Sequence, residues 1–484
     1  MATWNPPAKS PFSRRAGRRK GEDMQRMSYP SHARAILTLG LPLIGGHLGQ
    51  VAIGVTDTMM LGWYGVTELA ALTAAGSWFF VLFLMGSGFA WAVMPMVAAS
   101  HAEADDTAIR RATRMGLWLS LAFAALSLPL MIWSEPILLA LGQTDDVARL
   151  GAEYLQIAGW GIIPALIVMT LKSYLAALER TQIVFWITAI AALINALANY
   201  AFIFGHWGAP EMGIAGAALA SLATQCVMLV GVLLYVLWCL PEHTIFARLW
   251  RPDWEMMGRV FRLGWPIGLT NLSEVGLFAA SAFMMGWLGE VPQAAHGIAL
   301  QLASITFMVH LGLSNVATIR AGNALGRHDM PHMRRGAHTV TALSVAMAMA
   351  TIVLFVAVPE PLISLFLGRD VAGRDEIMAI GIVLLVMAAI FQLVDGAQVI
   401  ALGLLRGVQD TTVPMVLAGV SYWAVGMPCS YLFGFVLGWD GVGVWLGLVV
   451  GLACAGVALM IRFWWTSMPR LVAAKHRAEL ARAG

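Results

Sequence analysis

Long apolar runs separated by short polar segments form the main pattern of the chain. A run of about 20 apolar residues is long enough to cross a bilayer as a helix. The pattern predicts twelve such helices, and the absence of any stretch with period-two alternation excludes a transmembrane β-barrel. The predicted spans are 36–62, 69–99, 115–141, 153–177, 183–205, 213–240, 260–288, 293–319, 338–358, 377–404, 413–437 and 441–465.

The composition agrees with this pattern. Of the 484 residues, 59% are hydrophobic and 12% are charged, and the mean hydropathy is +0.75. Soluble domains carry about 25% charged residues. We therefore expect an all-α integral membrane protein.

The basic residues are distributed unevenly between the two sides of the predicted topology. Only Arg149, Arg369 and Arg374 of the 30 Lys and Arg residues fall on one side. Because cytoplasmic loops carry an excess of Lys and Arg, this bias predicts a multi-pass protein with both termini in the cytoplasm.

Two tails are expected to flank the membrane domain, a basic one at 1–34 and a second at 467–484. We interpret the first as a disordered, positively charged flank, with binding of anionic lipid or nucleic acid as the alternative. The apolar run that follows is too long for a signal peptide. Met24 and Met27 are alternative starts of the chain.

The chain contains an internal repeat. Leu39, Gly40 and Pro42 align at a constant offset with Leu263, Gly264 and Pro266, and the same offset aligns further pairs. These are Gly62-Trp63 with Gly286-Trp287, Gly88 with Gly312, and Arg110-Arg111 with Arg334-Arg335. Parallel repeats of this kind build two lobes with a cavity between them. The repeat predicts two pseudo-symmetric six-helix lobes, at 35–245 and 246–466.

Three acidic residues lie deep inside apolar runs: Asp57, Glu274 and Asp395. A carboxylate at the bilayer centre costs at least about 2.5–3.5 kcal/mol, so such groups face a polar cavity, bind a cation or hold a proton. We interpret the three acids as cation-coupling residues on a path for protons or metal cations. The alternative is that they are structural, hydrogen-bonded acids.

Other polar residues within the spans are candidates for lining the same cavity. Gln50 aligns with Glu274 across the repeat, and we group Gln301, Gln392 and Gln398 with it, with helix packing as the alternative. Two further pairs are interpreted as structural corners at the cytoplasmic side, Arg406 with Asp410 and Arg320 with Asn323.

Motifs for catalysis are absent from the sequence. There is no HExxH zinc motif, no nucleophile–base set and no GxxxxGK[ST] phosphate loop. The four cysteines have no CxxC spacing. We therefore expect no enzyme activity, no ATP-driven pumping and no cofactor other than a coupling ion.

The chain resembles the multidrug and toxic compound extrusion (MATE) family, in particular its NorM-like bacterial branch. The resemblance covers about residues 35–465. The segments that carry it are LGLPL and VTDTMMLG in the first span, GIAGAALA in the sixth, SEVGLFAA in the seventh, AAHGIAL and ATIRAGNALG in the eighth, and QLVDGAQVIALGLLRGVQDTTVP from the tenth.

The resemblance implies roles for particular positions. Asp57 matches the acid of the N-lobe cavity, with Asn195 and Asn199 as the NxxxN pair beside it. Glu274 and Asp395 match the acidic pair of the C-lobe, which is implicated in H⁺ or Na⁺ coupling and is therefore the possible sodium site. Phe391 stands where some members carry tyrosine, so it keeps a ring face for cations but lacks the hydroxyl.

From these observations we expect a cation-coupled antiporter in the bacterial inner membrane. It would use H⁺ or Na⁺, which the sequence does not separate, to export amphipathic, often cationic drugs. Expected partners are such organic cations and membrane lipid, with no nucleic acid, and the chain is expected to be a monomer. The alternative is a flippase or exporter of a lipid-linked or metabolite substrate on the same fold.

Overall fold

The computed structural model describes residues 27–367, 373–473 and 476, and within this part of the chain all regular structure is helical. Twelve helices or helix runs are long and apolar enough to cross a membrane, which confirms the predicted number. The elements are α2 (Tyr29–Tyr64), α3 (Val66–Ala102), α4 (Asp106–Ile132), α5 (Glu135–Ala140), α6 (Asp145–Ala158), α7 (Ile162–Ala177), α8 (Thr181–Phe204), α9 (Gly213–Cys239), α10 (Trp254–Leu288), α11 (Glu290–Gly326), α12 (Met330–Ala357), α13 (Pro359–Ser364), α14 (Arg374–Gly407), α15 (Thr412–Val420), α16 (Met427–Tyr431) and α17 (Asp440–Ile461).

The third span ends earlier than predicted, at Ile132 and not at 141. Trp133 leaves the helical conformation, and the short helix α5 begins two residues later with a proline in its first turn. Proline is favoured in the first turn of a helix and disfavours continuation of a helix from the preceding turn. The apolar residues after Ile132 therefore form a separate element.

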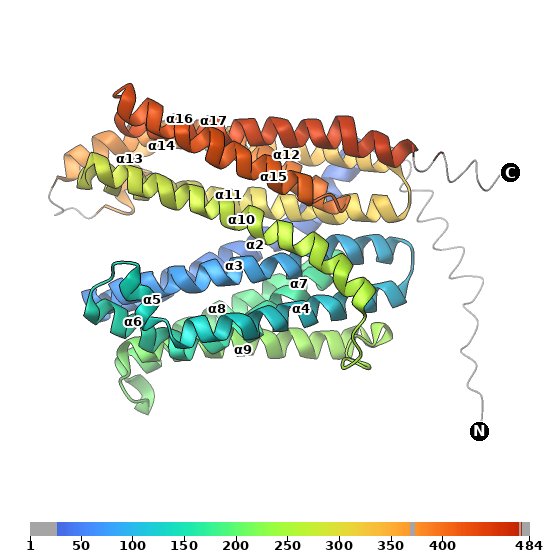
Figure 1. The fold of residues 1–484 in the computed structure, drawn as a ribbon, viewed down its shortest axis with the longest axis horizontal. Helices are drawn as coiled ribbons and strands as arrows, with labels where there is room; N and C mark the ends of the chain where they lie inside the picture. The colour runs from blue at the N-terminus through green and yellow to red at the C-terminus, as the bar shows by residue number, and fades with distance from the viewer. Residues whose placement is uncertain (1–26, 368–372, 474–475, 477–484) are drawn as a thin grey trace.

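The helices gather in two bundles, one containing α3–α9 and the other α11–α17 (Figure 1). The first helix of each half packs on both bundles: α2 lies against α8 and α11, and α10 lies against α3 and α15. The connection between the halves leads from Pro241 to Asp253. Each half thus reaches across to the other with its first helix.

Glycines of the repeat lie where these helices cross. A Cβ atom on Gly88 of α3 would stand 2.4 Å from the carbonyl oxygen of Gly264 on α10. At the matching crossing, a Cβ on Gly312 of α11 would stand 2.4 Å from the Ile44 side chain on α2. Only glycine allows backbones to approach this closely. The same repeat positions therefore hold the two halves together on both sides of the interface.

The predicted tails differ slightly from the helix boundaries. Ser28 caps α2 and the helix begins at Tyr29, so the segment 29–34 is helical rather than part of a tail. Most of the predicted 1–34 tail, residues 1–26, lies outside the described residues. Of the 467–484 tail, residues 474–475 and 477–484 lie outside them as well.

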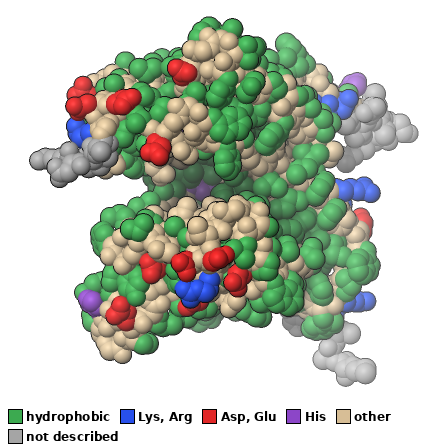
Figure 2. Space-filling model, turned by 60° about the vertical axis from the view of Figure 1, so that its left-hand side comes forward, with side chains coloured by type: hydrophobic (Ala, Val, Ile, Leu, Met, Phe, Trp, Pro, Cys, Tyr) green, Lys and Arg blue, Asp and Glu red, His purple; other side chains and the backbone are tan. Residues whose placement is uncertain are grey.

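The two ends of the molecule differ in charge. Figure 2 shows acidic side chains gathered at one end of both halves, with the surface hollowed between the halves. Helices that begin at this end carry acids in their first turns: Glu135, Asp145, Asp146, Glu290, Glu360, Asp375, Glu376 and Asp440. The opposite end, where α3 ends and α4 begins, holds most of the described arginines. We refer to these as the acidic end and the basic end.

Candidate functional site

Asp57 on α2 is nearly buried and sits among hydrogen-bond donors. Asn195 and Asn199 on α8 donate from Nδ2 to its Oδ1 at 3.0 and 2.6 Å. Ser221 on α9 donates from its hydroxyl to the other carboxylate oxygen at 3.3 Å. The Asp57 side chain is thus bonded from two neighbouring helices, and both of its oxygens are satisfied.

Helix geometry explains how this cluster forms. Asn195 and Asn199 lie four residues apart, so they occupy one face of α8, which packs against α2. Tyr154 on α6 extends the cluster, because its hydroxyl lies 3.4 Å from the Ser221 hydroxyl. The sequence analysis did not identify Ser221 or Tyr154. Neither forms a motif with Asp57, and only the packing of α6 and α9 brings them near it.

Glu274 on α10 and Asp395 on α14, both from the second half, line one cavity of about 180 Å³. Arg406, also on α14, lies at the same cavity. The walls are mostly apolar and come from both halves: Phe80, Leu84, Trp91, Asn271, Val275, Phe278, Leu300, Ala303, Ser304, Phe307, Met308, Leu311, Phe391, Val399 and Leu402 complete the lining.

The two carboxylates of this cavity are poorly satisfied. Oε1 of Glu274 and Oδ1 of Asp395 are buried and have no hydrogen-bond partner among the described residues. The two acids lie close enough for their charges to act on each other, and Arg406 acts on Glu274. Buried acceptors without donors are rare in folded proteins. A proton or a metal cation would satisfy these oxygen atoms.

Arg406 does not supply the missing bonds. Its Nη2 donates to Oδ1 of Asn271 at 2.9 Å, and its guanidinium lies 5.2 Å from the centre of the Trp91 ring. The cation–π and amide contacts fix the guanidinium beside the cavity. The carboxylates therefore have a positive neighbour but no hydrogen-bond donor for the two atoms named above.

The interpretation of Arg406 and Asp410 as one structural corner is wrong. Asp410 accepts from Nε of Arg462 at 2.9 Å and from the Ser467 hydroxyl at 3.0 Å. Since α14 continues to Gly407, Arg406 follows Asp395 by about three helical turns and lies on the same face. The spacing of Asp395 and Arg406 along one helix is the sequence feature from which the position of Arg406 at the cavity could have been predicted.

Arg320 and Asn323, predicted to form a second structural corner, also bind different partners. Arg320 contacts ring nitrogens of His32 and His332 at 2.8 and 3.1 Å. Asn323 donates to Glu179 at 3.2 Å. Both residues join helices at the basic end, but not through each other.

The remaining predicted residues fall in several places. Phe391 lines the cavity one turn before Asp395 and makes edge contacts with Phe278 and Trp445. Gln392 is buried and donates to the Ala303 carbonyl at 2.8 Å. The cavity is not lined by any of the four predicted glutamines, Gln50, Gln301, Gln392 and Gln398. Gln398 donates to the Tyr422 hydroxyl at 2.7 Å. Gln50 is exposed, and Gln301 is half-buried.

A transition-metal site is not formed by these residues. Within the described part of the chain, no three His, Cys, Asp or Glu side chains converge as metal ligands. The cavity offers two carboxylates with one positive neighbour. This donor set suits a proton or a hard cation, as oxygen ligands favour hard cations.

Comparison with known sequences identifies relatives over most of the chain. The family profile described as MatE matches residues 42–201 and 266–432. A protein of Rhizobium meliloti named "Probable multidrug resistance protein NorM" is 46% identical over 442 residues, which is 90% of this chain and 94% of the relative. A protein of the same name from Agrobacterium fabrum is 44% identical over 438 residues, with the same coverage.

Solved structures share the fold at low sequence identity. The crystal structure of the eukaryotic MATE transporter AtDTX14 matches with a TM-score of 0.81 and 17% identity, covering 93% of this chain and 99% of that one. A MOP superfamily transporter from Pyrococcus furiosus matches with a TM-score of 0.80 and 19% identity, covering 94% and 99%. At these identities the likeness establishes the two-bundle membrane fold.

Proposed function

The chain belongs to the MATE family, and from this premise we propose that it is a cation-coupled antiporter that exports amphipathic, often cationic organic compounds across a bacterial inner membrane. The observation that carries the proposal is the pair of buried carboxylates, Glu274 and Asp395, each with one oxygen atom that has no donor among the described residues. The relatives named as multidrug resistance proteins support transport rather than catalysis.

The charge of the cavity favours cations over anions. Glu274 and Asp395 are opposed by a single basic residue, Arg406, and the other lining residues carry no charge. An anionic, lipid-linked substrate, the alternative on this fold, needs basic residues in excess at its binding site. The one arginine here is already engaged by Asn271 and Trp91. The cavity thus supports export of cations over flipping of a pyrophosphate.

Coupling follows from the cost of leaving these carboxylates charged and empty. A buried carboxylate is stabilised by a proton, a metal cation or an organic cation. When ion and drug bind the same acids, or favour different arrangements of the two bundles, entry of the ion drives release of the drug. One elementary charge moving inward at about 100 mV supplies roughly 2.3 kcal/mol.

We assign the basic end of the molecule to the cytoplasm. The positive-inside rule carries this orientation. The hollow between the halves lies at the acidic end (Figure 2). In this orientation the hollow therefore opens on the side opposite the cytoplasm. The arrangement then corresponds to a state that releases substrate outward.

The test is efflux of a fluorescent organic cation from proteoliposomes that contain the purified protein. A proton gradient and a sodium gradient are imposed separately, with wild type and Asp395→Asn compared under each. We expect efflux under one gradient, which names the coupling ion, and loss of that efflux in D395N. Gradient-driven efflux that persists unchanged in D395N would refute the proposed coupling. No efflux with several cationic dyes would favour the lipid or metabolite alternative.

A further inference from the structure

Four arginines share one pocket at the basic end. Arg110 and Arg114 come from the first turns of α4, and Arg248 and Arg251 come from the connection between the two halves. Together with Ala247 they line a pocket of about 230 Å³. The proposed transport mechanism uses none of these residues. None of the acidic residues that the structure describes lines the pocket.

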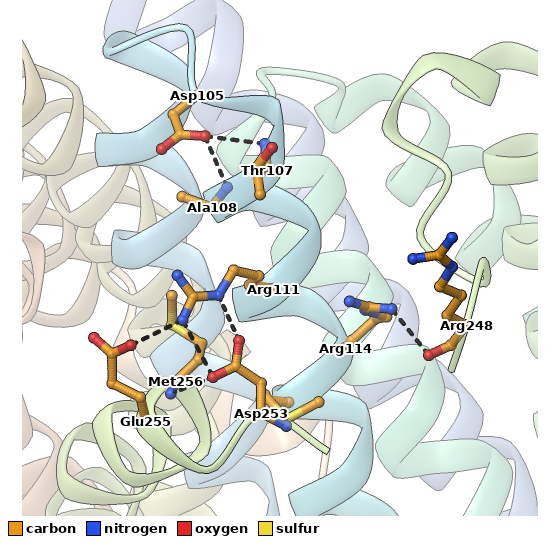
Figure 3. Close-up of polar contacts among 10 residues, drawn as sticks. Asp105, Thr107, Ala108, Arg111, Arg114, Arg248, Asp253, Glu255 and Met256 are labelled. Carbon is orange, nitrogen blue, oxygen red and sulfur yellow. Dashed lines mark hydrogen bonds and ion pairs between the residues drawn. The ribbon is translucent and has the colours of Figure 1, made fainter. Parts of the chain in front are cut away.

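The nearby acids are engaged elsewhere. Asp253 and Glu255 both bind the guanidinium of Arg111, which points away from the pocket side of α4 (Figure 3). Arg111 is therefore neutralised by two carboxylates, whereas no carboxylate of the described residues forms an ion pair or hydrogen bond with a pocket arginine. The charges that act on Arg114 are the like charges of Arg110 and Arg248 and the opposite charge of Asp253, which is already bound by Arg111. Like charges held this close leave a strong positive potential in the pocket.

The contacts that the pocket arginines make are to neutral groups. Arg110 donates to the Thr244 hydroxyl at 2.8 Å. Arg114 donates from Nη1 to the carbonyl oxygens of Ala247 and Arg248 at 2.6 and 3.0 Å. Figure 3 shows this bond to the Arg248 carbonyl, with the Arg248 side chain extending away from it. These bonds orient the guanidinium groups without compensating their charge.

Several donors in the pocket have no partner. Nε of Arg114 is buried and makes no hydrogen bond to the described residues. Over the same part of the chain, no ion pair or hydrogen bond is formed by the guanidinium groups of Arg248 and Arg251. Arg248 also adopts a left-handed backbone with φ of 55°, unusual for a residue with a side chain. Guanidinium donors that are held in place but lack hydrogen-bond acceptors are typical of a ligand site.

Exposed tryptophans lie next to the pocket arginines along the chain and indicate the depth of the pocket in the membrane. Trp250 and Trp254 are 75% and 74% exposed, and Trp118 is 39% exposed. Trp118 donates from its indole N–H to the Leu249 carbonyl at 2.7 Å, so it is fixed to the same connection. Tryptophan is enriched at the membrane–water interface. The pocket therefore lies at the level of the lipid headgroups.

We propose that this pocket binds a phosphate group, carried by an anionic phospholipid headgroup or by a free phosphate. Guanidinium groups bind phosphate oxygens through paired, charge-assisted hydrogen bonds, and basic pockets at this depth bind anionic headgroups. A phosphate here joins Arg110 and Arg114 of the first half to Arg248 and Arg251 of the connection. It thereby fastens the connection between the halves to α4.

The test uses purified full-length protein in a neutral detergent and measures its thermal stability as lipid or phosphate is added. Phosphatidylglycerol, phosphatidylcholine and inorganic phosphate are titrated separately. The variant is Arg248→Gln/Arg251→Gln, since neither side chain supports the fold by a hydrogen bond to the described residues. The matched control is Arg259→Gln/Arg262→Gln, two exposed arginines of α10 outside the pocket.

Wild type and the control are expected to be stabilised by phosphatidylglycerol and not by phosphatidylcholine. In R248Q/R251Q the apparent affinity for phosphatidylglycerol should fall roughly tenfold or more, since the variant removes two of the four positive charges that would bind the headgroup. Equal stabilisation by inorganic phosphate, lost in the same variant, would identify free phosphate as the source. Loss of the same size in both double variants, or in neither, would overturn the proposal.

Discussion

The two halves of the molecule treat their buried acids in opposite ways. Asp57 accepts three hydrogen bonds, two from Asn195 and Asn199 and one from Ser221. In the other half, Glu274 and Asp395 share a cavity, and each keeps a buried oxygen without a donor from the part of the chain that the structure describes. One half has supplied its carboxylate with polar partners. The other half has left two carboxylates open to a ligand.

An acid in a membrane span therefore does not by itself indicate an ion site. A carboxylate that accepts several hydrogen bonds has its charge stabilised by the protein. It gains less from an added cation than one that lacks donors. The sequence analysis grouped Asp57 with the cation-coupling residues. On this argument we propose instead that Asp57 positions α2 against α8, and that the coupling ion exchanges with solvent at the Glu274–Asp395 pair. The repeat has therefore kept the helices and changed the chemistry between them.

The largest expected effect comes from neutralising the acids one at a time. Glu274→Gln and Asp395→Asn should each lower ion-driven dye efflux at least about tenfold, since losing a contact of about 1.4 kcal/mol already changes binding by that factor. Asp57→Asn keeps an amide oxygen for Asn195 and Asn199, so efflux should fall less than about threefold. Efflux from proteoliposomes under the driving gradient measures all three.

Asp375→Asn, an exposed acid in the first turn of α14, is the matched control for loss of one negative charge. It should leave efflux unchanged. If D57N lost as much efflux as D395N while remaining folded, the distinction between the two halves would fail.

A smaller effect should appear in the stability of the Asp57 cluster. Asn199→Ala removes the 2.6 Å bond to Asp57 and should lower the free energy of unfolding by about 1.5 kcal/mol or more, as hydrogen bonds to charged groups do. In an Asp57→Asn background the same change should cost about 0.6 kcal/mol, the mean for hydrogen bonds between membrane helices. Unfolding in mixed micelles gives both values.

The difference between the two backgrounds isolates the contribution of the Asp57 charge, as in a double-mutant cycle. Asn195→Ala provides a second cycle on the same oxygen at 3.0 Å. An equal cost of N199A in both backgrounds would mean that the Asp57 carboxylate holds a proton in the folded protein.

Much of this architecture follows from the sequence because its signals are local or periodic. Apolar length gave the twelve spans, and the aligned glycines marked positions that the structure places at the crossings of α2 with α11 and of α3 with α10. The end of the third span was missed, because hydropathy continues past Ile132 whereas the backbone does not. The length of an apolar run indicates how many residues are hydrophobic, but it does not indicate where the helical backbone hydrogen bonds end.

The candidate site shows the same limit. Asn195 and Asn199 were identified because they belong to the same helix turn and match a family motif. Ser221 and Tyr154 were not, since their distance from Asp57 depends on how three helices pack. Arg406 was misassigned because its position near a predicted span end suggested a surface, and the helix in fact continues through it. Tertiary packing, which no short motif encodes, decides such cases.

The smallest expected effect concerns a carboxylate that has a cationic partner, the opposite case to Glu274 and Asp395. Its hydrogen bond to Arg111 lowers the pKa of Asp253, which also caps α10 by accepting from the Met256 N–H at 3.1 Å. Because the folded pKa lies below the unfolded value of about 3.9, this pair stabilises the protein above that pH, and the stabilisation disappears as pH falls through the folded pKa.

Asp253→Asn keeps a good cap but loses the charge, so it should lower the free energy of unfolding at pH 7 by less than about 1 kcal/mol. The deficit should shrink below about pH 4 and in high salt. A deficit independent of both pH and salt would assign the effect to the cap, and the ion pair would then contribute nothing.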